Sequence, residues 1–156
     1  MLHFATPRFN PFEKDLPKIR VTDLDKLVEN AVPGGWYMQY FGAFPDEPEL
    51  ARAIVSFANS DGGWIIIGVT ADETGAAASI PGFDRSVAHR PNEKARDMIL
   101  RSVSPVPPFE SRLIKLTDTH GVLIINVERG EDTPYLTSSG TVYRRSNSGA
   151  EPVAET

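Results

Sequence analysis

The stretch FANSDGGWIIIGV, at positions 57–69, decides the fold class of this chain. Its first seven residues combine the end of a predicted helix with two adjacent glycines, which permit a tight reversal of the backbone. The continuous apolar run Trp64–Val69 that follows is typical of a strand buried on both faces. The stretch therefore predicts a helix that turns sharply into a central strand of a sheet.

The helix that leads into this stretch is the clearest one in the chain. Pro45 and Asp46 mark its start, and its apolar residues recur at the spacing of one buried helical face: Leu50, Ala53, Ile54, Phe57 and Ala58. Packed against the strand at 64–69, this face would form the centre of the core. We expect the following side chains to be largely buried: Leu50, Ile54, Phe57, Ile65, Ile67, Val69, Ile124 and Val127.

Two further helices are expected, one on each side of this unit. A capping box predicts that the first begins with Thr22 as its N-cap and Asp25 three residues on, with an inward face of Leu24, Leu27 and Val28. Asn92 is expected to cap the second, whose length Pro105 limits. Its inward face would consist of Ala95, Met98, Ile99 and Val103.

The remaining apolar segments predict strands. They are 36–41, a hairpin of 109–117 with 121–128, and a last strand at 141–144. Helices and strands in this order predict an α/β or α+β fold, with a mixed sheet and helices packed against it. We expect residues 1–20 to form an extended N-terminal arm, 21–150 a single domain and 151–156 a polar tail.

The composition is that of one globular domain and excludes several function classes. The chain has 156 residues and no cysteine, which removes disulfides, thiolate catalysis and cysteine-based zinc sites. Its apolar runs are too short to span a bilayer and its N-terminus is no secretory signal, so we expect a cytoplasmic protein without membrane contact. The net charge of −5 argues against a wholly basic nucleic-acid surface but leaves room for a local one.

Searches for catalytic motifs find none. The chain has no phosphate-binding P-loop, no dinucleotide-binding glycine pattern and no nucleophile elbow. His3, His89 and His120 lack the spacing of metal ligands, and the acidic groups near 46–49, 72–73 and 131–132 are typical of solvated helix starts and loops. We therefore expect no catalytic residue, no metal and no cofactor.

Two segments are candidates for binding. In the first, the bare backbone at Gly62 and Gly63, beside Asn59 and Asp61, either supplies conformational freedom alone or makes room for a ligand or another chain. In the second, Tyr143-Arg144-Arg145-Ser146, arginine forks and a hydroxyl can bind phosphates while the tyrosine stacks on a base. The alternative for the second segment is an edge strand that charge protects from aggregation.

Together these segments resemble the Schlafen/AlbA-like domain family, which is assigned to DNA binding. The family pattern has an E-[FY]-K strand, a helix into F-A-N-[ST]-D/E-G-G, a strand ending I-G-V, a V-x-V strand, a P-Y segment and a terminal Y-x-R-x-x-S. This chain matches it at 57–69, 122–127, 134–135 and 143–146. The resemblance covers about residues 34–150 and implies a nucleic-acid or nucleotide partner.

One departure from the pattern bears on catalysis. In Schlafen relatives that cleave RNA, the strand glutamates and a later aspartate resemble a carboxylate cluster for a divalent metal. Here the upstream acidic position falls near Gly34, Gln39 and Phe41 replace the charged strand residues, and Asp72 alone could stand for the third carboxylate. A lone carboxylate does not hold Mg²⁺ and activate water.

The sequence thus favours a nucleic-acid-binding or nucleotide-sensing regulatory domain without catalysis, such as a transcriptional regulator, with self-association left open. Phosphates would contact Tyr143, Arg144, Arg145 and Ser146, with Asn59, Asp61, Gly62 and Gly63 on the same surface. Two alternatives remain: a metal-dependent endoribonuclease of Schlafen type, and a protein-interaction module whose ancestral site has decayed.

Overall fold

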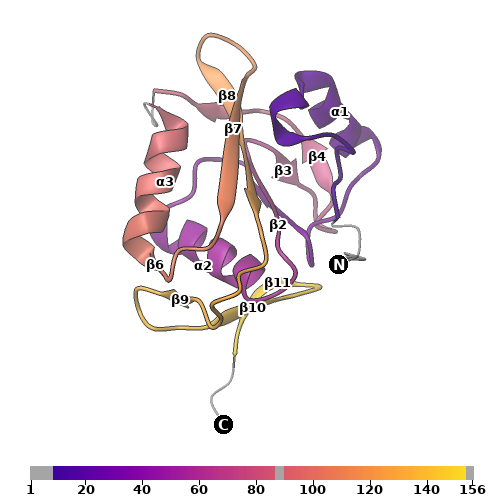
Figure 1. The fold of residues 1–156 in the computed structure, drawn as a ribbon. Coiled ribbons are helices and arrows are strands. Elements are labelled where there is room, and N and C mark those ends of the chain that lie inside the picture. The colour runs from indigo at the N-terminus through magenta and orange to yellow at the C-terminus, as the bar shows by residue number, and fades with distance from the viewer. Residues whose placement is uncertain (1–8, 87–89, 154–156) are drawn as a thin grey trace, which may run out of the picture.

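The structure is a computed structural model that describes residues 9–86 and 90–153 (Figure 1). A mixed sheet lies between two helical layers, which confirms the predicted α+β class. Its helices are η1 (Leu16–Lys18, a 3-10 turn), α1 (Val21–Glu29), α2 (Glu47–Ala58) and α3 (Pro91–Ser102). Its strands are β1 (Met38–Phe41), β2 (Gly63–Ile67), β3 (Thr70–Ala71), β4 (Ala77–Ser79), β5 (Phe83–Asp84), β6 (Val103–Ser104), β7 (Phe109–Lys115), β8 (His120–Val127), β9 (Leu136–Thr137), β10 (Tyr143–Ser146) and β11 (Gly149–Pro152).

The main sheet is built around β2 and β8. β1 pairs with β2 in parallel, whereas β2, β7 and the short β5 all pair with β8 antiparallel. Since β1 and β2 run the same way, the connection between them must cross over, and α2 provides that crossover. Within the part of the chain that the structure describes, three two-stranded pairs lie outside this sheet: β3 with β4, β6 with β9 and β10 with β11.

Successive residues of β2 point into different cores. Ile65 and Ile67 pack with α2 and α3, and Trp64 and Ile66 pack with α1 and the segment before it. This alternation explains the continuous apolar run, because both faces of the strand are covered. All the side chains predicted to be buried have exposures of 0 or 1%, so the predicted core is confirmed.

Both outer helices begin earlier than predicted. α1 starts at Val21 with Arg20 as its N-cap, because the Asp23 carboxylate accepts the Arg20 N–H (2.8 Å), so the box lies two residues before the Thr22–Asp25 pair. α3 starts at Pro91, since proline suits the first helical position, and Arg90 is its N-cap. Asn92 therefore lies within the first turn, where its amide donates to Ser111 Oγ (2.8 Å).

The two ends of the described chain are more ordered than expected. In place of an extended arm, residues 9–20 carry the η1 turn and bury Phe12, Leu16 and Ile19 against the sheet. At the other end, β11 includes two residues assigned to the polar tail and pairs with β10. None of the helices that the structure describes has the length and apolarity needed to cross a bilayer.

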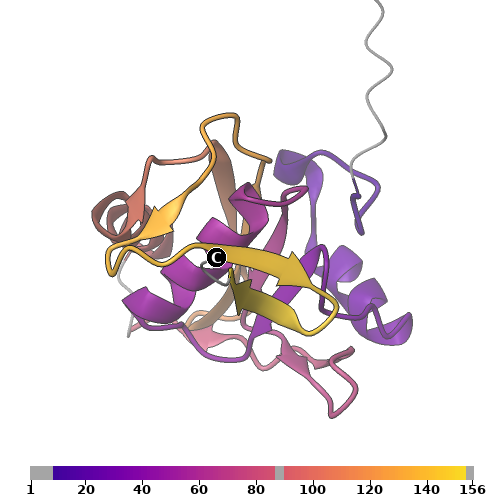
Figure 2. The same ribbon diagram turned by 90° about the horizontal axis from the view of Figure 1, so that it is seen from below.

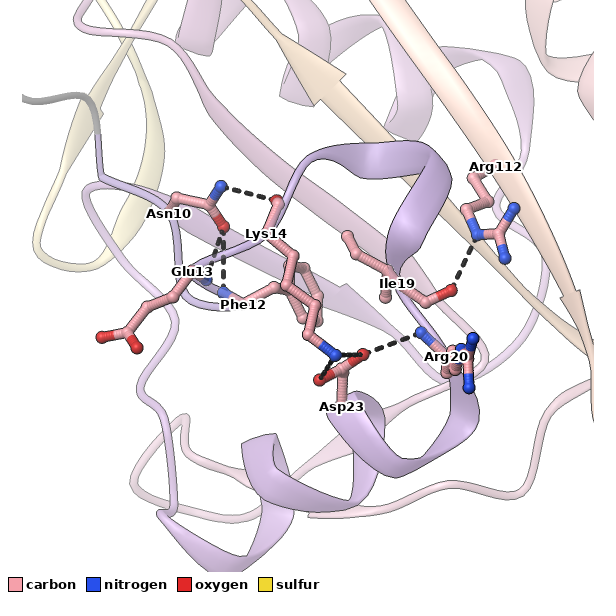
Figure 3. A network of polar contacts seen from close by, with 8 residues as sticks. All are labelled: Asn10, Phe12, Glu13, Lys14, Ile19, Arg20, Asp23 and Arg112. Carbon is pink, nitrogen blue, oxygen red and sulfur yellow. Dashed lines mark hydrogen bonds and ion pairs between the residues drawn. The ribbon is translucent and has the colours of Figure 1, made fainter.

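A buried carboxylate fastens the N-terminal segment to α1. Asp23 is 4% exposed, and its two oxygens contact Lys14 Nζ at 3.1 Å in addition to the Arg20 N–H (Figure 3). Burial raises the pKa of Asp23, but the Arg20 N–H and the Lys14 ammonium lower it more, so the pKa lies below its usual value. The ionised form is therefore the one that stabilises this corner.

We expect Asp23→Asn to destabilise the protein at neutral pH by about 1–2 kcal/mol, because it removes a charge-assisted hydrogen bond and an ion pair. The pKa of Asp23 is lower folded than unfolded, so its contribution is present above pH ~4 and is lost as the pH falls through the folded value. Urea unfolding of both proteins at pH 7 and pH 3 measures this. A difference between them that persists undiminished at pH 3 would contradict the assignment.

Candidate functional site

The two candidate segments meet, because β10 runs beside the turn that follows α2. Asn59 Nδ2 donates to the Tyr143 carbonyl at 3.0 Å, and the Arg145 N–H donates to Ser60 Oγ at 3.0 Å. Seen from below, the hairpin of β10 and β11 lies across α2 (Figure 2). The contact is made by hydrogen bonds inside the protein and not by an open groove.

Asn59 is occupied by the protein's own backbone. Its Oδ1 accepts the Tyr135 N–H at 2.7 Å, and its Nδ2 donates to the carbonyls of Tyr135 and Tyr143, both at 3.0 Å. Since these bonds use both ends of the amide, the side chain fastens the segments before β9 and at β10 to the end of α2. Asn59 is therefore a positioning residue in this fold.

Arg145 is buried, with 3% of its surface exposed. Its guanidinium lies over the Phe57 ring (4.1 Å to the centroid) and donates to protein acceptors only: the Gly35 carbonyl from Nε (2.9 Å) and Nη2, the Met38 carbonyl (3.1 Å), Gln39 Oε1 (3.2 Å) and Ser56 Oγ (3.3 Å). A guanidinium has five N–H donors, so this set uses them all.

None of these acceptors carries a charge. Burial accordingly lowers the pKa of Arg145 to about 10, which still leaves the side chain protonated at neutral pH. Gln39 stands where the Schlafen pattern has a glutamate, so an amide oxygen takes the place of the carboxylate. The side chain joins β10, α2 and β1, and it is not placed to contact the phosphates expected of it.

The two glycines accommodate the chain itself. Gly62 has φ +76°, and a Cβ there would lie 2.6 Å from the Val127 carbonyl oxygen. A Cβ on Gly63 would lie 2.3 Å from the Phe57 ring. Gly62 thus uses its conformational freedom, and both glycines leave room for other parts of this same chain, which neither of the two interpretations of the sequence included. Asp61 is exposed, and its Oδ1 lies 3.9 Å from Arg129 Nη1.

Two of the positions that correspond to the Schlafen carboxylate cluster, Gly34 and Gln39, line one polar pocket. This pocket of about 290 Å³ lies between Gly34, Gln39, the turn joining β3 to β4 and the turn joining β10 to β11, with Arg145 in its wall. Asp72 belongs to the first of these turns, but its Oδ1 accepts from the side chain and N–H of Thr74 and from the Ala76 N–H. These hydrogen bonds, that of the Thr74 hydroxyl foremost, lower the pKa of Asp72.

The remaining titratable groups form no further cluster. Within residues 9–86 and 90–153, no group of three or more histidine, aspartate or glutamate side chains could hold a metal ion. His120 Nδ1 shares a hydrogen bond with Thr119 Oγ1 (2.8 Å), and His3 and His89 lie outside the described residues.

Arg144 on β10 and Arg52 on α2 are both exposed. The Arg52 guanidinium lies 5.5 Å from the centroid of the half-buried Tyr143 ring. Beside it, a pocket of about 180 Å³ is lined by residues that include Ser138 and Ser139. Ser146, also on β10, is partly buried, and its Oγ lies 3.4 Å from Ser148 Oγ, within hydrogen-bond distance. Sequence reasoning missed Arg52, although it is the single basic residue of α2.

The family description "Schlafen, AlbA_2" matches residues 37–154, most of the chain. The chain belongs to the Schlafen AlbA_2 family. This Schlafen AlbA_2 domain also resembles solved structures at 18% identity, a likeness that shows the fold alone. One is the DIP2311 protein of Corynebacterium diphtheriae, with a TM-score of 0.53, of which the chain spans 26% while 85% of the chain is covered.

The second structure similar to the Schlafen AlbA_2 domain is the N-terminal domain of a Nitrosomonas europaea protein named as related to the ATP-dependent DNA helicase RecG. It gives a TM-score of 0.54, and the alignment covers 85% of this chain and 86% of that domain. No curated protein matches the chain.

Proposed function

We propose that this Schlafen AlbA_2 domain binds nucleic acid, without catalysis, on the face formed by α2 and the hairpin of β10 and β11. The observation that carries the proposal is that Arg145 is buried while its neighbour Arg144 is exposed. Arg145 is held in the fold by neutral acceptors, whereas Arg144 is exposed on the outer face of β10 and Arg52 is exposed over the Tyr143 ring. Phosphate contact therefore falls to the two exposed guanidinium groups.

The chemistry of this face suits a phosphodiester chain. Exposed guanidinium groups bind phosphate oxygens through paired N–H donors. The adjacent pocket adds the hydroxyls of Ser138 and Ser139, which can donate to phosphate or sugar oxygens. Its lining also includes the Glu47 carboxylate, whose charge is offset by Arg101 at 2.6 Å. The net charge of −5 is compatible with such a site, because the positive electrostatic potential that attracts phosphates is then confined to a small surface. A contact of this size suits a regulatory interaction of modest affinity.

The polar pocket at Gln39 supports the non-catalytic part of the proposal. An arginine, an amide and a glycine line the pocket where a nuclease of this family would gather carboxylates, and among the described residues Glu73 is the one carboxylate in that lining. Phe41 packs against the apolar core, and the Asp72 carboxylate is held within its own turn. Activation of water by a divalent metal needs several anionic ligands at one point. A regulatory role, such as transcriptional control, fits a domain of this kind.

The test is a titration of labelled single- and double-stranded oligonucleotides at several salt concentrations. We expect Arg52→Ala combined with Arg144→Ala to weaken binding at low salt and to lower the slope of log affinity against log salt by roughly 1–2 units. The matched control is Lys18→Ala with Arg96→Ala, which removes the same charge from exposed positions on η1 and α3 and should leave the slope nearly unchanged.

Two results would contradict the proposal. An unaltered salt slope in the Arg52/Arg144 variant would remove the assigned face, and absence of binding at low salt would favour a protein-interaction module. Cleavage of tRNA by the wild-type chain with Mg²⁺ or Mn²⁺, lost in Asp72→Ala, would establish the endoribonuclease instead.

A further inference from the structure

β7 leaves one edge of the main sheet open among the described residues. It pairs with β8 in a register that places Glu110 opposite Asn126 and Arg112 opposite Ile124. The bonds that flank the ladder, Glu128 N–H to the Pro108 carbonyl and Leu116 N–H to the His120 carbonyl (both 3.0 Å), show that even-numbered residues bond to β8. The odd-numbered residues Phe109, Ser111, Leu113 and Lys115 therefore direct their N–H and C=O groups to the open edge.

The space beside this edge is a groove. Two adjoining pockets of about 460 and 630 Å³ follow β7 and share Asn92, Glu110 and Ser111. The first is bounded by the start of α3 and the second by Leu16 and Pro17 of η1. In Figure 1, β7 correspondingly stands between α3 and the segment of η1 and α1. An added strand would thus find backbone partners in the middle and a wall on each side.

The charges of β7 are complementary to those of a second β7. In an antiparallel pair of identical edges, the outward-directed odd residues must face odd residues. A two-fold axis at Glu110 places carboxylate against carboxylate, and one at Arg112 places guanidinium against guanidinium. An axis at Ser111 instead places each Glu110 opposite the other copy's Arg112, and each Phe109 opposite the other copy's Leu113. Direct cross-strand pairs of opposite charge stabilise, and like charges destabilise.

Both charged partners are available for this pairing. Glu110 is exposed. Arg112 uses Nε to donate to the Ile19 carbonyl at 2.8 Å, and no other contact among the described residues uses its terminal nitrogens (Figure 3). Because Glu110 and Arg112 lie on the same face of β7, the two pairs would form side by side around the axis.

We propose that a second copy of this chain docks on the open edge of β7, antiparallel and with Ser111 on the two-fold axis, which joins the two sheets into one. The self-complementary charge pattern selects this occupant over an unrelated peptide. The proposal is independent of the nucleic-acid face, which lies on α2 and the C-terminal hairpin.

Sedimentation of the full chain over a wide concentration range tests the dimer. We expect a monomer–dimer equilibrium whose association constant falls at least about tenfold in Glu110→Arg and in Arg112→Glu, and recovers to nearly the wild-type value when both changes are combined. Arg112→Glu also gives up the bond to Ile19, so melting temperatures accompany each measurement. Glu110 has no described partner to lose, which makes Glu110→Arg decisive if Arg112→Glu folds poorly.

A cross-linking experiment tests the axis itself. The chain has no cysteine, so Ser111→Cys introduces a single thiol. Opposed Cβ atoms across an antiparallel pair are about 4.5–5.5 Å apart, within reach of a short thiol cross-linker. Ser111→Cys should give covalent dimer and the exposed control Ser138→Cys should not. A chain that stays monomeric at all concentrations, or a dimer indifferent to the charge reversals, would overturn the proposal.

Discussion

Arg145→Met is expected to lower the free energy of unfolding by about 3–5 kcal/mol and the melting temperature by about 10 °C. Methionine keeps an unbranched apolar stem over Phe57 but removes every donor. The carbonyls of Gly35 and Met38 would then remain buried without their guanidinium partner. Each buried carbonyl left without a hydrogen-bond donor lowers the free energy of unfolding by about 1–3 kcal/mol. Denaturant unfolding followed by circular dichroism measures the change.

Arg144→Met is the matched control, since Arg144 is the exposed neighbour on the same strand, and its effect should lie within about 0.5 kcal/mol. A second comparison uses Gln39→Glu, which places a carboxylate 3.2 Å from Arg145 Nη1 in otherwise identical geometry. It should stabilise the wild type by about 1 kcal/mol and fail to stabilise Arg145→Met. Equal effects of the Arg144 and Arg145 changes would refute the structural role of Arg145.

Asn59→Asp should destabilise the protein by about 2–4 kcal/mol at neutral pH, although the two side chains have almost the same shape. The substitution keeps the acceptor for the Tyr135 N–H but replaces the Nδ2 donor by a carboxylate oxygen facing the carbonyls of Tyr135 and Tyr143. Oxygen then opposes oxygen at both contacts. Chemical denaturation at pH 7 measures the loss.

This variant has a distinctive pH dependence. Repulsion by the two carbonyls would raise the pKa of the new carboxyl in the folded state, because the protonated form can donate where the ionised form cannot. Stability relative to the wild type should therefore recover as the pH falls toward 4, with the opposite sign to Asp23. Asn147→Asp, at an exposed turn, is the control, and a penalty for Asn59→Asp that does not change with pH would speak against the assigned bonds.

Apolar periodicity was sufficient to predict the core. The apolar stripe on α2 and the uninterrupted apolar run of β2 mark the faces that are buried. A polar residue at any of these positions would interrupt the pattern, so the sequence alone identifies the buried faces. Helix starts were harder, because a cap depends on which backbone N–H a side chain reaches. From the sequence alone, either Asp23 or Asp25 could accept the backbone N–H of an N-cap residue three positions earlier. The path of the segment before α1 makes Asp23 the acceptor, with Arg20 as the N-cap.

The sequence predicted which residues gather at the candidate site, but it did not predict which of them are buried and hold the fold together. The sequence singled out Asn59 and Arg145, and both lie at the junction of α2 with β10. That junction is formed across more than eighty residues of chain, so no local pattern distinguishes an arginine that faces solvent from its buried neighbour. Alternation along a strand places one inward and one outward, and only tertiary packing shows which is which.

The bond between Arg145 and the Gly35 carbonyl links positions 110 residues apart, and this bears on the timing of synthesis. Ribosomes add about 5–20 residues per second, so the Gly35 carbonyl would wait roughly 5–20 s for its partner after it is made. During that interval β1 and α2 can assemble around β2, but the place of the guanidinium over Phe57 remains empty. A nascent chain should therefore reach protease resistance in two stages, the second only after Arg145 has left the exit tunnel.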